Sequence, residues 1–231
     1  MKKEITMMVA AFNEEKDLQN AVTGLDKILR ELFDGYEIII FDDGSTDNTP
    51  QIADSLAKNN SKIRVVHNDG NKGLGYNYRK AAGLARKKYF GWIPGDDETD
   101  RDSLREVLSH VGESDIIISY TTNKKIRSFF RRILSGSYTF LLNALFNLRL
   151  RYYNGISIYR TDDLRKVRMT TNSFAFPSEI LVTLLKKGIS YMEIPMKIRP
   201  KKETKIFRIK NVIGVVSTIA SLFFRHIFGR L

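Results

Sequence analysis

The feature that most constrains the fold is an alternation of short apolar runs with amphipathic segments over the first half of the chain. The apolar runs predict strands at 5–10, 37–41, 63–66, 89–93 and 115–119. The segments between them place apolar residues at helical spacing, at 14–33, 49–58, 76–88 and 102–111. Such alternation, with nearly continuous apolar strands, predicts an α/β fold with a mostly parallel central sheet flanked by helices.

A polar cluster follows each of the first four predicted strands. The clusters read FNEE, DDGSTD, NDGNKGLG and PGDDE. Because the carboxyl ends of parallel strands lie along one edge of a sheet, and ligands bind beyond that edge, these four clusters are expected to meet. The sequence therefore predicts a nucleotide site there.

The second half of the chain has a different pattern. It predicts a long helix at 124–148, a strand at 155–159, a helix at 177–187 and a strand at 191–194. The last uncharged run, 212–224, has thirteen residues, whereas a bilayer span needs about 20. We expect an amphipathic helix in the membrane interface with Arg225 and Arg230 among the headgroups, and the alternative is a helix packed on protein. The expected domains are a catalytic domain at 1–195 and a membrane-interface extension at 196–231.

The net charge of +12 is unevenly distributed. Residues 1–115 hold 16 basic and 21 acidic side chains, residues 116–161 hold 8 basic and no acidic ones, and residues 196–231 hold 9 basic ones against Glu203. Basic segments of this kind attract phosphorylated substrates, anionic lipid or nucleic acid, or are simply solvated. The acidic first half argues against nucleic acid.

The absence of cysteine excludes disulfide and thiolate chemistry. The polar residue Asn13 and the charged residue Glu14 come too early for a signal peptide, so a cytoplasmic protein is expected.

Three strand-end clusters offer polar contacts to a nucleotide. Asp42 and Asp43 are acceptors for nucleobase N–H groups or ribose hydroxyls, and the alternative is that they serve the turn. Glu14 has the same ambiguity, because acids in a first helical turn complement the helix dipole. Lys72 and the glycines after it precede a predicted helix, whose N-terminal amides are expected to meet phosphate.

The stretch GDDE is the sharpest feature. Asp96 and Glu98 lie two residues apart after a strand, so an extended turn lets both face one ion. Mg²⁺ and Mn²⁺ take such hard oxygen ligands together with substrate phosphates. Neighbouring acids also repel one another without a cation, which favours a divalent metal site at Asp96 and Glu98.

Read together, VAAFNEE, FDDGSTDNT, NKGLGYN and PGDDE resemble the motifs of family 2 glycosyltransferases with the GT-A fold. The resemblance implies a nucleotide site and a catalytic, metal-binding motif. The implied nucleotide-binding residues are Ala10, Phe12, Glu14, Asp42, Asp43, Lys72 and Asp96. The implied catalytic residues are Asp96, Asp97 and Glu98. The second half, including YYNGISIYR and YMEIPM, is similar to polyprenyl-phosphate glycosyltransferases. Their acceptor-phosphate residues are matched here by Arg127, Arg131, Arg132 and Ser135.

Two positions depart from that family pattern. Pro94 stands where the family has the first acid of its metal motif, so Asp96 and Glu98, with Asp97 as a substitute, have to hold the ion. Tyr152 stands where many relatives have an aspartate that handles the acceptor. A hydroxyl acceptor needs a base, for which Asp97 or Asp100 is then required, whereas a phosphate monoester is already ionised near neutral pH.

The expected function is therefore an inverting, metal-dependent glycosyltransferase that moves a sugar from a UDP- or GDP-sugar to a polyprenyl phosphate. It is expected at the cytoplasmic membrane face, with Mg²⁺ or Mn²⁺ as cofactor and no nucleic-acid partner, and a homo-oligomer is left open. One rival is a family 2 enzyme with a glycan or soluble acceptor. Another is a non-catalytic membrane-binding relative, for which Pro94 and Tyr152 are the marks of lost chemistry.

Overall fold

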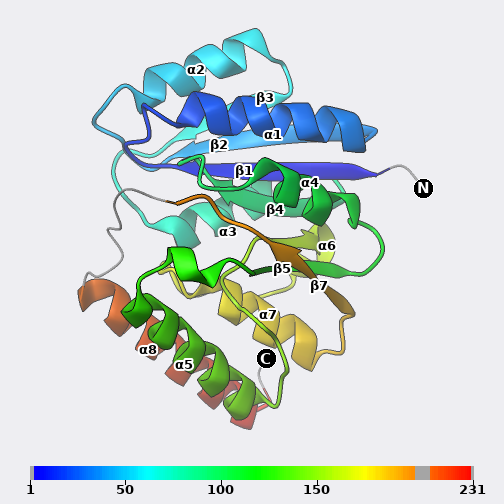
Figure 1. Ribbon diagram of the computed structural model, residues 1–231, viewed down its shortest axis with the longest axis vertical. Coiled ribbons are helices and arrows are strands. Elements are labelled where there is room, and N and C mark those ends of the chain that lie inside the picture. The colour runs from blue at the N-terminus through cyan, green and yellow to red at the C-terminus, as the bar shows by residue number, and fades with distance from the viewer. Residues whose placement is uncertain (1–2, 201–208, 230–231) are drawn as a thin grey trace.

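The computed structural model describes residues 3–200 and 209–229, which are arranged around one seven-stranded sheet (Figure 1). The strands are β1 (Glu4–Ala11), β2 (Gly35–Asp42), β3 (Ile63–His67), β4 (Tyr89–Pro94), β5 (Ile116–Thr121), β6 (Ser157–Arg160) and β7 (Tyr191–Met196). Their order across the sheet is β3-β2-β1-β4-β6-β5-β7. Among these strands only β6 runs antiparallel to its neighbours, β4 and β5. The expected α/β fold with a mostly parallel sheet is confirmed.

The helices cover both faces of this sheet. They are α1 (Leu18–Leu32), α2 (Thr49–Asn59), α3 (Leu74–Leu84), α4 (Arg101–Ser109), α5 (Phe129–Phe146), α6 (Thr161–Arg165), α7 (Phe176–Lys186) and α8 (Ile209–Ile227), with a 3-10 turn η1 (Lys124–Ile126). The long helix expected at 124–148 is divided, because η1 ends before Ser128, whose hydroxyl accepts the Arg131 N–H and caps α5. The short α6 was not expected, since five residues carry too little periodicity to be recognised.

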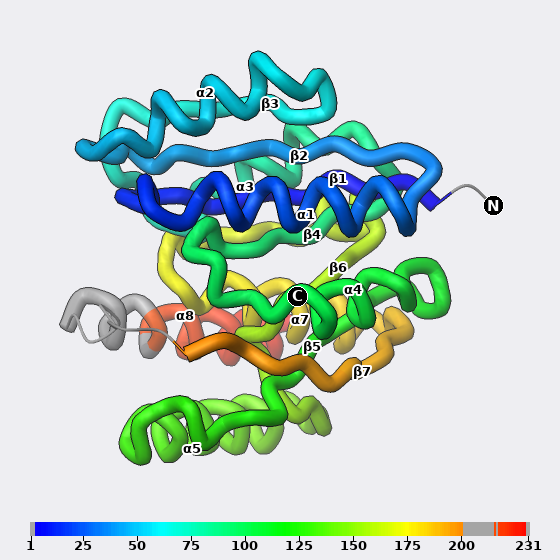
Figure 2. Tube along the Cα trace, turned by 45° about the horizontal axis from the view of Figure 1, so that its top comes forward, coloured from blue at the N-terminus to red at the C-terminus, as the bar shows by residue number. Residues whose placement is uncertain are grey.

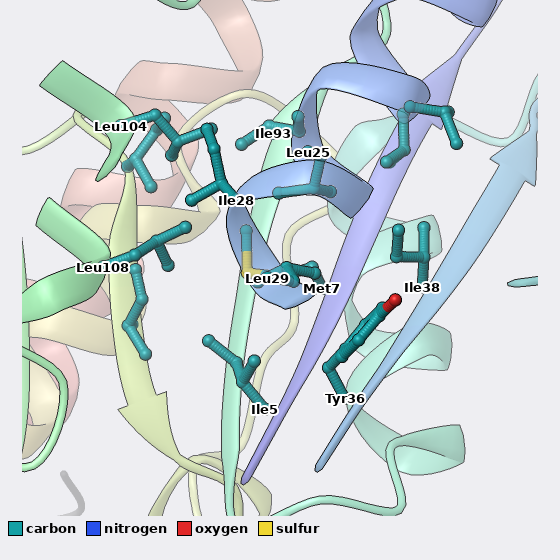
Figure 3. Packing of buried hydrophobic residues seen from close by; sticks show 14 of the residues in the cluster. Ile5, Met7, Leu25, Ile28, Leu29, Tyr36, Ile38, Ile93, Leu104 and Leu108 are labelled. Atoms are coloured by element: carbon teal, nitrogen blue, oxygen red, sulfur yellow. The ribbon is translucent and has the colours of Figure 1, made fainter. Parts of the chain in front are cut away.

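Alternation along the central strands separates two hydrophobic cores. Met7 and Ile38 lie in a cluster with buried residues of α1, α2 and α4, and Figure 3 shows Leu25 and Leu29 of α1 directed toward them. Met8 belongs to the opposite cluster, with buried residues of α3, α5 and α7. Because successive side chains of a strand point to opposite faces, an apolar strand needs a helix layer on each side. The helix layers on both faces hold the strands in place and so fix the positions of the strand ends that carry the polar clusters.

The last helix, α8, packs against α5 and α7 (Figure 2). Its Leu222 is fully buried in the second cluster. Arg225 donates to Glu179 of α7 at 2.8 Å, and only 15% of its side chain and 1% of that of Glu179 are exposed. The expectation that Arg225 lies among lipid headgroups is therefore wrong, because a buried carboxylate holds it inside the protein.

The C-terminal part of the chain is thus joined to the sheet domain. The expected boundary at residue 195 falls inside β7, and Arg199 N–H donates to the Glu98 carbonyl at 2.8 Å. Within the described residues, no helix is long and apolar enough to cross a membrane. Arg230 and the middle of the basic stretch, 201–208, lie outside the described residues.

Candidate functional site

The four polar clusters meet at one edge of the sheet. The parallel register sets Ala10 beside Pro94, Ala11 beside Asp42, and Asp42 beside His67. The carboxyl ends of β1, β2, β3 and β4 are therefore neighbours, as the sequence predicted. Phe12, one of the expected nucleotide contacts, is exposed at this edge, and Ala10 is partly buried.

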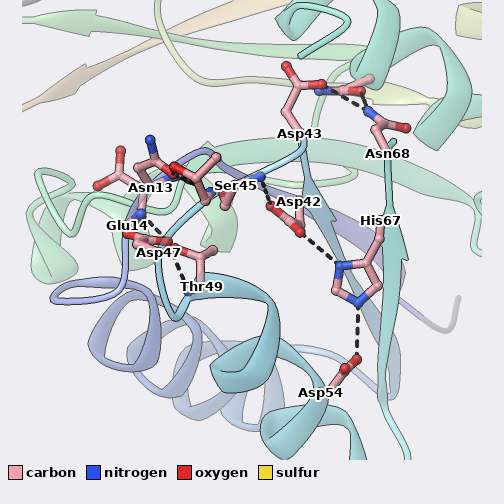
Figure 4. Close-up of polar contacts among 12 residues, drawn as sticks. Asn13, Glu14, Asp42, Asp43, Ser45, Asp47, Thr49, Asp54, His67 and Asn68 are labelled. Atoms are coloured by element: carbon pink, nitrogen blue, oxygen red, sulfur yellow. Dashed lines mark hydrogen bonds and ion pairs between the residues drawn. The ribbon is translucent and has the colours of Figure 1, made fainter. Parts of the chain in front are cut away.

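The first two clusters are locked together by reciprocal hydrogen bonds (Figure 4). Asn13 N–H donates to the Ser45 hydroxyl at 2.9 Å, and Thr46 N–H donates to the Asn13 side-chain oxygen at 2.8 Å. Glu14 N–H donates to the Thr49 hydroxyl at 2.8 Å. Asn13 has a φ of 57°, the left-handed region that asparagine tolerates better than most residues. These contacts hold the loop with Glu14 rigidly against the loop that follows Asp42.

Asp42 is the buried acceptor of this site, with 2% of its surface exposed. One of its oxygens accepts the Ser45 N–H at 3.0 Å, and the other lies 2.8 Å from Nδ1 of His67. Nε2 of His67 lies 3.1 Å from Asp54 of α2. Although burial lowers it, the hydrogen bonds to Asp42 and Asp54 raise the pKa of His67 above its ordinary value. Each carboxylate oxygen has two lone pairs, so Asp42 keeps acceptor capacity for a ligand.

Asp43 has a different role from its neighbour. Its two oxygens accept bonds from the Asn68 amide at 2.9 Å, Lys72 N–H at 2.8 Å and Gly73 N–H at 3.0 Å. Asp43 is buried, so these bonds anchor the loop after β3. Three of its four lone-pair positions are thereby used.

The N-terminus of α3 is also occupied by the protein itself. Gly75 N–H donates to the Asn172 carbonyl at 3.1 Å, and a Cβ at Gly75 would lie 2.4 Å from the Thr171 carbonyl. The expectation that these amides bind phosphate is wrong for Lys72, Gly73 and Gly75, whose N–H groups have protein acceptors. The Lys72 ammonium pairs with the exposed Asp69 at 2.8 Å.

The PGDDE turn separates its acids into different roles. Gly95 N–H donates to the Ala10 carbonyl at 2.8 Å, and Asp96 accepts the Glu98 N–H at 3.1 Å. Asp97 has a φ of 49°, and its oxygens lie 3.5 Å from Arg101 and 3.1 Å from Arg199. Because these two arginines already pair with the Asp97 carboxylate, Asp97 is poorly placed as a substitute metal ligand.

Asp100, considered as a base for a hydroxyl acceptor, caps α4 instead. It accepts the Ser103 N–H at 3.0 Å and the Ser103 hydroxyl at 2.8 Å. These bonds lower the pKa of Asp100, with burial acting in the opposite direction. A carboxylate held in this way is a weak base.

The donor set that the sequence predicts for a metal is Asp96 with Glu98. Within the described residues, no three His, Cys, Asp or Glu side chains are grouped in a way that suits a metal ion. Two carboxylates suit Mg²⁺ or Mn²⁺ when the substrate supplies phosphate oxygens as further ligands. The residues present therefore fit a divalent ion that arrives with a nucleotide better than one held by protein alone.

A basic pocket of about 350 Å³ opens between α5 and the segment that precedes β6. Three of the four expected acceptor residues line it, namely Arg127, Arg132 and Ser135. Tyr152, which the sequence analysis placed at the acceptor position, lines it as well. Its other lining residues, which the sequence interpretation missed, are Thr121, Lys124, Gly136, Thr139, Phe140, Asn143 and Arg151. The absence of acids from 116–161 was a signal for Lys124 and Arg151, but only the fold brings them to Arg127.

Tyrosines orient two of the pocket's guanidinium groups. Arg127 donates to the Tyr152 hydroxyl at 2.9 Å and lies 5.5 Å from that ring's centroid. Arg151 donates to the Tyr120 hydroxyl at 2.6 Å and lies 4.6 Å from its centroid. Arg127 Nε is buried and has no acceptor in the part of the chain that the structure describes. The two tyrosines thus hold the arginines in place, and Arg151 Nε also lies 3.9 Å from a carboxylate oxygen of Glu193, which is not among the pocket's lining residues.

Arg131 links this pocket to the PGDDE turn. Its side chain is half-buried, and it does not line the pocket. Burial and the neighbouring Arg127 guanidinium lower the pKa of Arg131, while Tyr152 and Glu98 oppose the shift. Backbone contacts bring the two halves of the site together, because Ile198 N–H donates to Asn123 Oδ1 at 3.1 Å, beside the pocket residue Lys124, and Arg199 N–H donates to the Glu98 carbonyl at 2.8 Å.

Comparison with known proteins agrees with this arrangement. A family model described as "Glycosyl transferase family 2" matches residues 6–172. Over 226 residues the chain is 27% identical to glycosyltransferase AglD of Haloferax volcanii. The matched region covers 94% of this chain but only 36% of that protein. Over 241 residues it is 23% identical to dodecaprenyl-phosphate galacturonate synthase of Rhizobium johnstonii, with 99% and 71% covered.

Among solved structures, the chain is similar to glucosyl-3-phosphoglycerate synthase from Mycobacterium tuberculosis, crystallised with Mn²⁺, uridine diphosphate and phosphoglyceric acid. The TM-score is 0.70 at 16% identity, over 96% of this chain and 78% of that one. At this identity the likeness shows a shared fold, and it confirms the expected GT-A architecture.

Proposed function

The chain belongs to glycosyl transferase family 2, and on that premise we propose that it is an inverting glycosyltransferase that moves a sugar from a UDP- or GDP-sugar to a polyprenyl phosphate. The observation that carries the proposal is the adjacency of two unlike sites. Arg199 N–H donates to the carbonyl of Glu98 at 2.8 Å, and the preceding Ile198 N–H donates to the side-chain oxygen of Asn123 at 3.1 Å, next to the pocket residue Lys124. The carboxylate pair Asp96 and Glu98 and the basic pocket are therefore joined through one short segment. A donor diphosphate with its cation suits the first, and an acceptor phosphate suits the second.

The donor nucleoside occupies the edge formed by β1 and β2. Asp42 accepts a nucleobase N–H or a ribose hydroxyl with the lone pairs that Ser45 and His67 leave unused. Glu14 and Phe12 border the same edge. The Mycobacterium tuberculosis neighbour was crystallised with uridine diphosphate, which supports a nucleotide donor.

Asp96 and Glu98 would hold the divalent ion, together with phosphate oxygens of the donor. When bound, such an ion neutralises charge on the leaving nucleoside diphosphate. Mn²⁺ in the Mycobacterium tuberculosis neighbour supports this assignment. Pro94 supplies no ligand, so the ion depends on the nucleotide for its remaining coordination.

The acceptor phosphate occupies the basic pocket. Arg127 presents a buried Nε donor, and Arg132, Arg151 and Lys124 add charge around it. A phosphate monoester has a second pKa of roughly 6, so it attacks without a base. This suits a site in which Tyr152 replaces an acid, Asp97 is paired with arginines and Asp100 caps a helix. The Rhizobium johnstonii relative is named as a dodecaprenyl-phosphate enzyme, which supports a lipid phosphate.

The exposed side of α5 carries the membrane contact at the inner face of the cell membrane. Phe129 is 69% exposed and Phe140 75% exposed, and the same stripe includes Phe130, Ile133, Leu134 and Leu141. Apolar patches of this extent are unusual on soluble monomers and mark binding surfaces. Lys124, Lys125 and Arg132 lie on or just before this helix, which matches an anionic lipid surface. Because Phe140 also borders the basic pocket, a lipid phosphate reaches that pocket from the membrane.

The proposal is tested by incubating the protein with radiolabelled UDP- and GDP-sugars, Mg²⁺ or Mn²⁺, and a polyprenyl phosphate in vesicles. Label that moves into the organic phase identifies the lipid product, and Asp96→Ala is expected to abolish the transfer. Arg127→Ala removes a guanidinium group of the pocket and should lower the transfer, and Arg149→Ala, at an exposed arginine outside the pocket, is its matched control. Nucleotide binding without turnover on any acceptor would favour a non-catalytic relative.

A soluble phosphorylated acceptor is the second candidate. The Mycobacterium tuberculosis neighbour was crystallised with phosphoglyceric acid, and the basic pocket suits a small phosphate ester equally well. Label that stays in the aqueous phase with a phosphorylated small molecule, and does not enter lipid, would establish this alternative.

A further inference from the structure

The contact between His67 and Asp42 indicates a role for His67 that the proposed function does not include. His67 is the last residue of β3 and lies between a buried carboxylate of β2 and an exposed carboxylate of α2 (Figure 4). Nδ1 is 2.8 Å from Asp42 Oδ2, and Nε2 is 3.1 Å from Asp54 Oδ1. Both ring nitrogens are therefore within hydrogen-bond distance of an oxygen that only accepts.

This arrangement selects one protonation state of the ring. A neutral imidazole has one N–H and one lone pair, so one of its nitrogens would set a lone pair against a carboxylate oxygen. An imidazolium has two N–H groups and satisfies both Asp42 and Asp54. Among the residues that the structure describes, Asp42 and Asp54 are the charged groups that act on the ring, and both favour the cation.

We propose that His67, as an imidazolium, is a positioning residue for the nucleotide donor: it fixes the Asp42 carboxylate in its accepting orientation and makes nucleotide affinity depend on pH. The inference rests on the proposed function, because it assumes that Asp42 contacts the nucleoside. Within the described contacts, Asp42 has two anchors of its carboxylate, the Ser45 N–H and His67. Loss of the ring proton leaves the backbone N–H as the remaining anchor, so the carboxylate turns more freely and must be ordered when the nucleotide binds.

The direction of the pH effect follows from the ring's charge. The bridge is complete while the ring is protonated and is lost as pH rises through the pKa of His67, which its two hydrogen bonds raise. Nucleotide affinity is therefore expected to be highest at the acidic end of the physiological range and to decline toward pH 8.5. Asp54→Asn removes the exposed carboxylate and leaves Asp42 in place, so the decline should begin at lower pH.

The test measures the dissociation constants of UDP and GDP with Mg²⁺ by calorimetry from pH 6 to 8.5, for the wild type, His67→Gln, Asp54→Asn and His110→Gln. The wild type should bind about 10-fold tighter at pH 6.5 than His67→Gln, and this difference should shrink as pH rises. Ionisation of the probe's phosphate is common to all four proteins, so the comparison removes it. His110 lies at the C-terminal end of α4, away from this edge, and its variant should follow the wild type.

Nitrogen-15 spectra of the three histidines give an independent readout. Both nitrogens of His67 should carry protons at pH 6.5 in the wild type, and the midpoint of its titration should move to lower pH in Asp54→Asn. If His67→Gln does not fold, Asp54→Asn still tests the inference through the shifted affinity profile. A wild type and His67→Gln with equal affinities and equal pH profiles would overturn it, as would a neutral His67 at pH 6.5. Absence of nucleotide binding by the wild type at every pH would instead contradict the proposed function and the inference together.

Discussion

Arg225 of α8 donates to Glu179 of α7 at 2.8 Å, in a contact that is almost closed to solvent. Glu179 also accepts the Thr170 N–H at 2.9 Å and the Thr170 hydroxyl at 2.7 Å. The last helix is thus joined to the core by a satisfied buried carboxylate. A residue pair 46 positions apart in the sequence decides where the C-terminal segment lies.

Removal of Arg225 should destabilise the whole domain. Arg225→Ala leaves the Glu179 charge buried, although three other hydrogen bonds still support it, so a loss of about 2–4 kcal/mol in the free energy of unfolding is expected. Urea unfolding followed by circular dichroism measures this loss. Arg149→Ala, at an exposed arginine, should change the stability by less than about 0.5 kcal/mol. Equal stabilities of the two variants would contradict the buried pair.

Substitutions of Asp96 and Asp97 in the PGDDE turn should have different effects on turnover. Asp96→Asn removes a proposed metal ligand and should lower kcat/KM by about 100-fold, which corresponds to roughly 2.7 kcal/mol of transition-state stabilisation. Asp97→Asn keeps a residue that tolerates the positive φ and loses only the pairs with Arg101 and Arg199, so its activity should remain within about 10-fold of the wild type. A greater loss for Asp97→Asn than for Asp96→Asn would show that the metal assignment is wrong.

Tyr152 should control the acceptor and not the donor. Tyr152→Asp places a carboxylate beside Arg127 and neutralises part of the pocket's charge, so the KM for the acceptor phosphate should rise more than 10-fold while donor affinity is unchanged. Tyr152→Phe loses one hydrogen bond but keeps the ring under the guanidinium, so a smaller rise is expected. Initial-rate kinetics with each substrate varied in turn separate these effects. Higher activity in Tyr152→Asp would indicate an acceptor that needs a base.

Stability should fall with rising pH through the titration of His67. The pKa of His67 is raised in the folded state, so its contribution is complete below the unfolded value of about 6.5 and is lost as pH rises through the folded value. The free energy of unfolding of the wild type should therefore decline above pH 6.5 more steeply than that of His67→Gln. His110, whose pKa is raised by Glu113 and Glu106, contributes a second decline of the same sign, which His110→Gln should remove separately. Parallel curves for the wild type and His67→Gln would contradict the bridge.

Membrane binding should depend on the exposed face of α5. Phe130→Ser with Phe140→Ser removes two exposed rings and should abolish co-sedimentation with vesicles of phosphatidylglycerol. The melting temperature should change little, because both rings are mostly exposed. Leu84→Ser, at an exposed apolar residue of α3, is the control and should bind vesicles like the wild type. Retained binding by the double variant would place the contact elsewhere.

Much of the sheet and of the donor edge was available from the sequence. The apolar runs that contain Met7 and Ile38 predict strands, because a strand that is buried on both faces needs apolar side chains at successive positions. The acids at 42, 43, 96 and 98 were recognised because parallel strands end along one edge, whatever the details of packing. Local pattern therefore fixed the class of fold, the edge that carries the site and the match to a glycosyltransferase family.

The role of each acid was decided by tertiary structure. Asp42 and Asp43 are adjacent in the sequence, but one meets His67 of β3 and the other meets the amides of the loop beyond β3. The roles of Asp96 and Asp97 differ for the same reason, because Asp97 pairs with Arg199, which lies more than 100 positions away in the sequence. Hydrogen-bond partners of this kind come from distant segments, so no local pattern indicates which carboxylate is occupied.

The same reason explains the C-terminal helix and the basic pocket. A run of thirteen uncharged residues suits a membrane interface and a protein groove equally, and the buried Glu179 decides for protein at Arg225. Arg127 and Arg151 are both visible as basic residues, yet only the return of the chain after α5 sets them around one pocket. Sequence determines which side chains are apolar, acidic or basic and how often they recur, whereas the free energy of burying and pairing them depends on neighbours that only the folded chain supplies.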